Sequence, residues 1–145
     1  MSKIWLKNYP EGVPEHIDYP NITMYQLFEE KANRWSEHTS LIFMGKKMTY
    51  SELKEKVDTF SCALHKLGVK KGDKVAIFMP NCPQVVISYL ATLRLGTVVV
   101  MCNPMYTEDE LVHQLNDSDY HRYKGQVCNT GIDDRELQQG NGSSR

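Results

Sequence analysis

The chain has 145 residues, of which 41% are hydrophobic and 24% are charged, as in a soluble globular domain. This composition excludes a wholly disordered, a collagen-like and a membrane-spanning chain, and the length permits one ordinary domain. The 17 basic and 18 acidic residues give a net charge of -1, so no nucleic-acid partner is expected.

The cysteines and the start of the chain indicate the cellular compartment. Cys62, Cys82, Cys102 and Cys128 lack the close spacing that a zinc site or a redox dithiol requires, so no metal site is expected. No long apolar run occurs, so neither a secretory signal nor a transmembrane segment is expected. We therefore expect a cytoplasmic protein with reduced thiols, either free or attached to the periphery of a membrane. The first three cysteines adjoin apolar segments and are predicted to be buried and inert.

Residues 1–22 contain three of the six prolines and are predicted to form an extended N-terminal arm. Three helices are predicted further on, each beginning at a threonine with a glutamine or glutamate three residues later, the pattern of a capping box. The pairs are Thr23 with Gln26, Thr49 with Glu52, and Thr107 with Glu110. Between the first two helices, residues 40–44 and 47–49 flank a glycine-lysine turn and predict a short β-hairpin.

Helical spacing predicts which faces of the first two helices are buried. The buried face of the first helix is expected to hold Met24, Leu27, Phe28, Ala32 and Trp35. The buried face of the second is expected to hold Leu53, Val57, Phe60, Leu64 and Leu67. Asp58 is placed on the exposed face of this second helix, which is expected to end at Gly68.

Residues 74–102 carry the strongest structural signal. Two apolar runs, at 74–79 and 97–102, enclose a helix that begins after Asn81 or Cys82 and ends at Gly96. This order predicts two parallel strands joined by a right-handed helical crossover. The helix is apolar nearly all round, so we expect it to be deeply buried. Two parallel strands cannot bury both of their faces, so an α/β fold with further strands and helices is expected.

The last 25 residues, 121–145, differ from the rest of the chain. Apolar residues are sparse there and show no core-facing periodicity. Two interpretations are open. Residues 121–145 form a polar, disordered tail, or they are not the natural continuation of residues 23–120.

Several ionisable residues could act in catalysis or binding, but each is better explained as an ordinary exposed residue. The candidates are two pairs of adjacent carboxylates, two pairs of adjacent lysines and one histidine: Glu29 with Glu30, Asp133 with Asp134, Lys46 with Lys47, Lys70 with Lys71, and His65. The carboxylates are predicted to be solvated, the lysines to lie in exposed turns and the histidine on a helix surface. No glycine-rich turn of the kind that cradles phosphate opens a helix before residue 120. We therefore assign no catalytic, cofactor-binding or metal-ligating residue, and leave the substrate-binding residues unassigned.

A series of sequence blocks resembles the opening of the adenylate-forming, or AMP-binding, superfamily of acyl-CoA synthetases. The blocks occur in the family's order and spacing, at residues 48–53, 67–77, 80–83, 90–96 and 103–111. The last block, which contains Asn103, Pro104, Tyr106 and Thr107, most resembles long-chain fatty acid CoA ligases. The resemblance covers roughly residues 20–120.

The resemblance implies a fold and an activity. It implies part of the N-terminal subdomain of an adenylate-forming enzyme, with residues 23–120 as a partial AMP-binding domain. Such enzymes use ATP and magnesium to convert a fatty acid to an acyl-adenylate, and then transfer the acyl group to coenzyme A. The family's phosphate loop, adenine-binding block, ribose-binding aspartate and catalytic lysine lie beyond the matching region. We therefore expect no cofactor in this fragment and no activity from the fragment alone.

The chain departs from the resemblance after Tyr120. A polar run from His121 stands where family members continue with another apolar strand, which we interpret as a disrupted reading frame or a truncated gene. An unfinished sheet exposes strand edges, so we expect self-association through those edges, poor solubility or a molten state. The alternative interpretation is a non-catalytic binding or interaction module of the α/β class.

Overall fold

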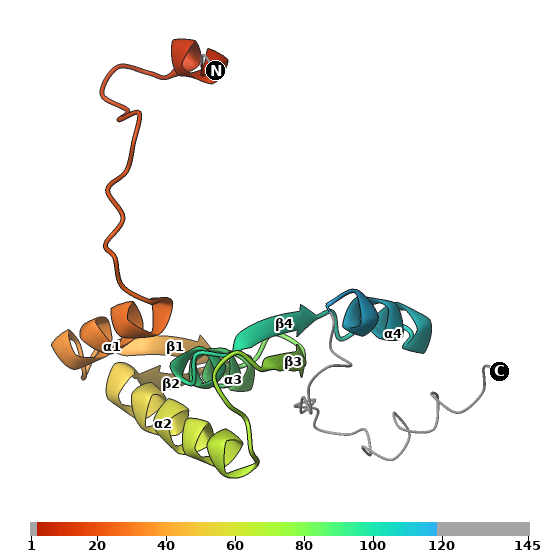
Figure 1. Cartoon of the computed structure of the whole chain (residues 1–145). Coiled ribbons are helices and arrows are strands. Elements are labelled where there is room, and N and C mark those ends of the chain that lie inside the picture. The colour runs from red at the N-terminus through yellow and green to blue at the C-terminus, as the bar shows by residue number, and fades with distance from the viewer. Residues whose placement is uncertain (1–2, 119–145) are drawn as a thin grey trace.

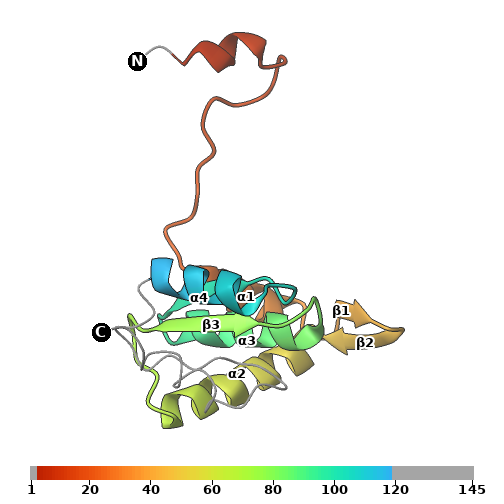
Figure 2. The same cartoon turned by 90° about the vertical axis from the view of Figure 1, so that its right-hand side faces the viewer.

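The computed structural model describes residues 3–118, so the expectations for residues 121–145, including Cys128 and the Asp133–Asp134 pair, lie outside the described part. Its elements are, in chain order, η1 (Ile4–Asn8), α1 (Met24–Arg34), β1 (Thr39–Phe43), β2 (Lys46–Thr49), α2 (Tyr50–Lys66), β3 (Lys74–Phe78), α3 (Pro83–Arg94), β4 (Val98–Cys102) and α4 (Glu108–Asp117). Figures 1 and 2 show that the segment before α1 stands away from a body formed by the other elements.

Capping boxes begin α1, α2 and α4, as the sequence predicts. In each box the threonine side chain accepts the backbone N–H of the residue three positions on, and that residue's side chain accepts the threonine N–H. The return bonds to Gln26, Glu52 and Glu110 are each 2.8 Å long. Gly68 follows α2 with a φ of 95°, the left-handed conformation that glycine adopts most easily.

The strands form two separate two-stranded sheets within the described residues. β1 and β2 pair antiparallel as the predicted hairpin. β3 and β4 pair parallel with Lys74 opposite Val98 and Phe78 opposite Cys102, and α3 connects them. The predicted strand-helix-strand unit is therefore confirmed.

The two faces of the β3–β4 sheet are covered by different helices, because successive strand residues point to opposite faces. Val75 packs into the larger core cluster with residues of α1, α2 and α3, namely Tyr25, Leu53, Val57, Leu64, Leu90 and Ala91. Its neighbour Ala76 packs with Val100, Cys102 and two leucines of α4, Leu111 and Leu115. Figure 2 shows β3 between α4 and the α2–α3 pair.

The orientation of α1 differs from the prediction. Tyr25 and Ala32 are its buried residues, whereas Met24 and Trp35 are 58% and 38% exposed. The face toward α2 is therefore rotated from the predicted stripe. Trp35 follows the last helical residue, and the side chains of Lys31 and Arg34 lie over its ring.

Four further burial predictions are wrong. Leu67 lies beyond the last turn of α2 and is 61% exposed. Cys62 is exposed, and Asp58 is half-buried instead of solvated. α3 is not deeply buried, because in the described part of the chain it has only two strands beneath it. The apolar side chains that remain half-buried are Val85, Val86, Ile87, Tyr89 and Leu93.

Candidate functional site

Ligands of parallel α/β sheets bind at the carboxyl ends of the strands, so a ligand-binding site is expected first at that edge of the β3–β4 sheet. The turn after β3 leads through Cys82 into α3, with Pro83 as the first helical residue and no side-chain cap. The turn after β4 is ordered by Asn103, whose side-chain oxygen accepts the Met105 N–H at 3.0 Å. The Asn103 side chain is therefore engaged with the chain's own backbone, whereas the N-terminus of α3 has no side-chain partner of its own.

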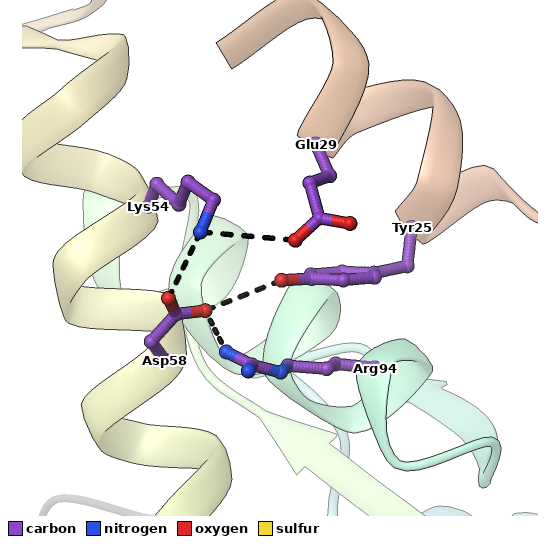
Figure 3. A network of polar contacts seen from close by, with 5 residues as sticks. All are labelled: Tyr25, Glu29, Lys54, Asp58 and Arg94. Carbon is purple, nitrogen blue, oxygen red and sulfur yellow. Dashed lines mark hydrogen bonds and ion pairs between the residues drawn. The ribbon is translucent and has the colours of Figure 1, made fainter. Parts of the chain in front are cut away.

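A cluster of five polar side chains lies between α1, α2 and α3 (Figure 3). We call it the Asp58 cluster; it consists of Tyr25 and Glu29 of α1, Lys54 and Asp58 of α2, and Arg94 of α3. Asp58 is the centre, because its carboxylate accepts the Tyr25 hydroxyl at 3.2 Å and the Lys54 ammonium at 3.1 Å, and also pairs with Arg94. Lys54 also pairs with Glu29 at 3.7 Å.

The electrostatics of the Asp58 cluster keep Tyr25 a hydrogen-bond donor. Burial raises the pKa of the Tyr25 hydroxyl; the Arg94 guanidinium opposes this rise, and the negative charge of Glu29 adds to it. The guanidinium also lies 5.5 Å from the centre of the Tyr25 ring. Two carboxylates therefore face two cations and a protonated phenol, so the cluster is neutral and internally satisfied.

Carboxylates elsewhere in the described chain also serve as internal acceptors. Glu52 and Glu110 close capping boxes, and Asp73 accepts the Lys70 N–H at 2.7 Å. Thr107 donors lower the pKa of the Glu110 carboxyl. No group of three histidine, cysteine or acidic side chains in residues 3–118 could hold a metal ion. Glu52, Glu110 and Asp73 are therefore already engaged as acceptors within the chain.

The acidic and basic pairs noted in the sequence lie in different environments in the structure. Glu29 belongs to the Asp58 cluster, whereas its neighbour Glu30 pairs with Lys31 at 3.1 Å on the surface. Glu29 is half-buried with 40% of its side chain exposed, so the predicted solvation of this carboxylate is only partial. The two lysine pairs are exposed, Lys46 with Lys47 at the start of β2 and Lys70 with Lys71 before β3.

The histidine and cysteine candidates are also dispersed. His65 is exposed on α2, as predicted. Cys82 is half-buried at the start of α3, and Cys102 is buried in β4, where burial raises the pKa of its thiol. Cys62, which we predicted to be buried, is exposed on α2. The structure brings none of these groups together in the residues it describes.

Sequence reasoning missed the Asp58 cluster. Its members lie on three helices, and Tyr25 and Asp58 are 33 positions apart in the chain. One signal was available: Arg94 is the single charged residue in α3, a helix that is otherwise apolar or neutral. A cation beside a core is commonly paired with an anion, which points to a carboxylate on a neighbouring helix.

None of the helices in residues 3–118 is long and apolar enough to cross a bilayer.

The comparisons with known proteins identify the family. The model of the AMP-binding enzyme family matches residues 28–124, which is more than half of the chain. The chain therefore belongs to the AMP-binding enzyme family, whose members include adenylate-forming acyl-CoA synthetases. The fold agrees, since solved structures that it resembles include the N-terminal subdomain of an adenylation protein.

Individual relatives support this assignment. The long-chain-fatty-acid CoA ligase of Bacillus subtilis is 40% identical over 117 residues, and the ligase of that name from Yersinia pestis is 43% identical over 120 residues. Each match covers 81% of this chain and 21% of the relative. The N-terminal subdomain of Klebsiella oxytoca NpsA, in complex with anthranilyl-AMSN, has a TM-score of 0.68 at 27% identity, over 85% of this chain and 34% of that one. The chain thus spans about a fifth of the length of the curated relatives it matches.

Proposed function

We propose that this chain contributes the N-terminal part of the AMP-binding domain to a ligase that activates a fatty acid with ATP and transfers it to coenzyme A. The observation that carries the proposal is the identity of 40% and 43% with two long-chain-fatty-acid CoA ligases over four-fifths of the chain. ATP, magnesium, the fatty acid and coenzyme A are the small-molecule ligands of that whole enzyme. Its proposed location is the cytoplasm, in solution or at a membrane surface.

We propose further that the 145-residue chain is inactive alone and that residues 23–120 act as a scaffold within the larger domain. The internal use of the Asp58, Glu52, Glu110 and Asp73 carboxylates supports this, because these groups hold the chain's own helices and turns. Residues 1–22 are an arm in this proposal, and residues 121–145 are a polar tail or a frameshifted segment.

A chimeric enzyme tests the proposed activity. Residues 28–118 of this chain would replace the matching segment of the Bacillus subtilis ligase, and palmitate-dependent exchange of pyrophosphate with ATP would be measured. We expect the chimera to retain exchange, because the segment supplies scaffold of the same fold. The unmodified ligase is the positive control. A chimera that folds, as judged by its circular dichroism and melting, but shows no exchange would contradict the proposed function.

The isolated chain tests the second statement. Purified 145-residue chain is expected to show neither palmitate-dependent exchange nor heat of binding with ATP, palmitate or coenzyme A. Exchange that persists after the chain has been purified free of other ligases would overturn the proposed inactivity.

The rival function is an interaction module that self-associates through the β3–β4 sheet. In the described residues each of these strands pairs on one side, and Val98 and Met101 of β4 are 49% and 45% exposed. Self-association and the absence of ligand binding are expected of the inactive fragment as well, so sedimentation equilibrium is combined with a thermal melt. A discrete dimer with a sharp, cooperative melt would favour the module, whereas a monomer, or aggregates without a cooperative melt, would contradict it.

A further inference from the structure

α1 contributes less apolar packing to the larger core cluster than α2 or α3 does. α1 buries two apolar residues and α2 buries three. α3 also buries two, but it packs four half-buried apolar side chains against the same cluster, whereas α1 packs only Phe28 there. One of the two buried residues of α1 is Ala32, which has little apolar area to bury. Because the hydrophobic contribution follows buried apolar area, α1 depends on a further interaction for its position.

The Asp58 cluster supplies that interaction. Tyr25 and Glu29 are its members on α1, and each has a partner on α2, at Asp58 and Lys54 respectively. Arg94 of α3 joins the same carboxylate and also lies against the Tyr25 ring. All three helices therefore meet at one group of charges (Figure 3). Hydrogen bonds to ionised groups are stronger than those between neutral groups.

The position of α1 matters because the chain before it has no other described attachment to the body. Residues 3–22 precede α1 directly, and their described side-chain hydrogen bonds, from Lys3 to Glu15 and His16, stay within that segment. Figures 1 and 2 show this segment extending away from the body. The direction of the whole segment is therefore set by the orientation of α1.

We propose that the Asp58 cluster is an electrostatic latch: it holds α1 against α2 and α3, and when it is broken α1 and residues 3–22 detach as a unit while the β3–β4 sheet stays folded. This inference goes beyond the proposed function and does not depend on it. The latch predicts that local unfolding of α1 costs less free energy than unfolding of β3, because different parts of a protein unfold as cooperative units of unequal stability.

The latch is sensitive to salt because its charges are near solvent. The side chains of Asp58 and Arg94 are each 34% exposed, and those of Lys54 and Glu29 are 26% and 40% exposed. The Debye length falls from about 10 Å at 0.1 M salt to about 3 Å at 1 M. High salt therefore weakens the latch, whereas it does not weaken the apolar packing that holds β3.

Hydrogen exchange of the full 145-residue chain, followed by two-dimensional NMR, tests the latch. The amides of Leu27 and Lys31 report on α1, and that of Ile77 reports on β3, because the register that places the Val98 N–H on the Asp73 carbonyl directs the Ile77 N–H toward β4. In Asp58→Asn, which keeps the size of the side chain and removes its charge, we expect the α1 amides to exchange about tenfold faster, as for loss of one charged hydrogen bond. The Ile77 amide should keep its rate. Glu55→Gln, a charge change at an exposed position of the same helix, is the control and should change neither.

Two further measurements separate a latch from a general loss of stability. Raising sodium chloride from 0.1 M to 1 M should increase the ratio of the α1 rate to the Ile77 rate in the original chain, but not in Asp58→Asn. Tyr25→Phe removes the hydroxyl and keeps the ring, so it should give a smaller acceleration than Asp58→Asn. Equal acceleration of α1 and β3, unchanged α1 rates in Asp58→Asn, or α1 amides without protection in the original chain would each overturn the proposal.

Discussion

Two leucines at the C-terminal end of α2 provide a direct test of the core. Leu64 is 2% exposed and belongs to the cluster that α2 and α3 share, whereas Leu67 is 61% exposed. Helical spacing alone assigns both to the buried face. Leu64→Ala and Leu67→Ala delete the same atoms, so any difference between the two variants comes from the environment of each side chain.

The expected magnitudes differ severalfold. Leu64→Ala removes three buried carbons, worth about 2.4 kcal/mol at about 0.8 kcal/mol for each. The cavity left between α2 and α3 raises the loss to about 3–4 kcal/mol. Leu67→Ala removes atoms that already contact water, so we expect a change within about 0.5 kcal/mol. Because a domain of this kind is stable by only about 5–15 kcal/mol, the first change is a large fraction of the total.

Urea denaturation followed by far-ultraviolet circular dichroism measures both values. The transition of Leu64→Ala should shift to lower urea without a change in its slope, and that of Leu67→Ala should overlay the original chain. Equal losses in the two variants would refute the orientation of α2. A gradual curve without a transition would contradict a fixed core, and would instead support the molten state that the sequence predicts from the unfinished sheet.

Two further predictions concern single ionisable groups. Thr107 donors lower the pKa of Glu110, so this interaction stabilises the start of α4 above the unfolded-state pKa, and the contribution is lost as pH falls through the lowered folded-state pKa. Thr107→Ala removes the hydroxyl donor and keeps the backbone N–H donor, which is the larger cause, so an NMR titration should show a partial rise in the pKa of Glu110. An unchanged value would contradict the hydrogen bond from the Thr107 hydroxyl. Iodoacetamide, followed by peptide mass spectrometry, should modify the exposed Cys62 well before Cys102, because Cys102 is 4% exposed and burial raises its thiol pKa. Equal rates would show that the cluster beneath α4 is open.

Local signals were sufficient to predict most of the elements. A capping box needs only a threonine and a residue three positions on, so the starts of α1, α2 and α4 can be read from the sequence. Gly68 similarly marks the end of α2 through its own backbone conformation. The parallel pairing of β3 and β4 follows from the length of the helix between them.

Contacts between elements distant in the chain could not be predicted in the same way. Spacing places Met24 on an apolar stripe of α1, but the partner helix lies against Tyr25 because Asp58 and Arg94 bind there. Cys62 adjoins apolar residues on α2 and is exposed, since burial depends on which helix covers that side. The position of the Asp58 cluster is determined by the packing of three helices, which short sequence patterns do not encode.

The arginine in α3 also limits how that helix can turn about its own axis. A helix with apolar side chains on nearly every side can pack against a sheet in several rotational settings of similar energy, because the hydrophobic effect is non-directional. Ser88 and Thr92 do not remove this freedom, since the Thr92 hydroxyl donates to the Ser88 carbonyl within the helix. An ion pair to a fixed carboxylate on α2 is directional, so Arg94 selects one setting and thereby determines which apolar side chains of α3 face outward.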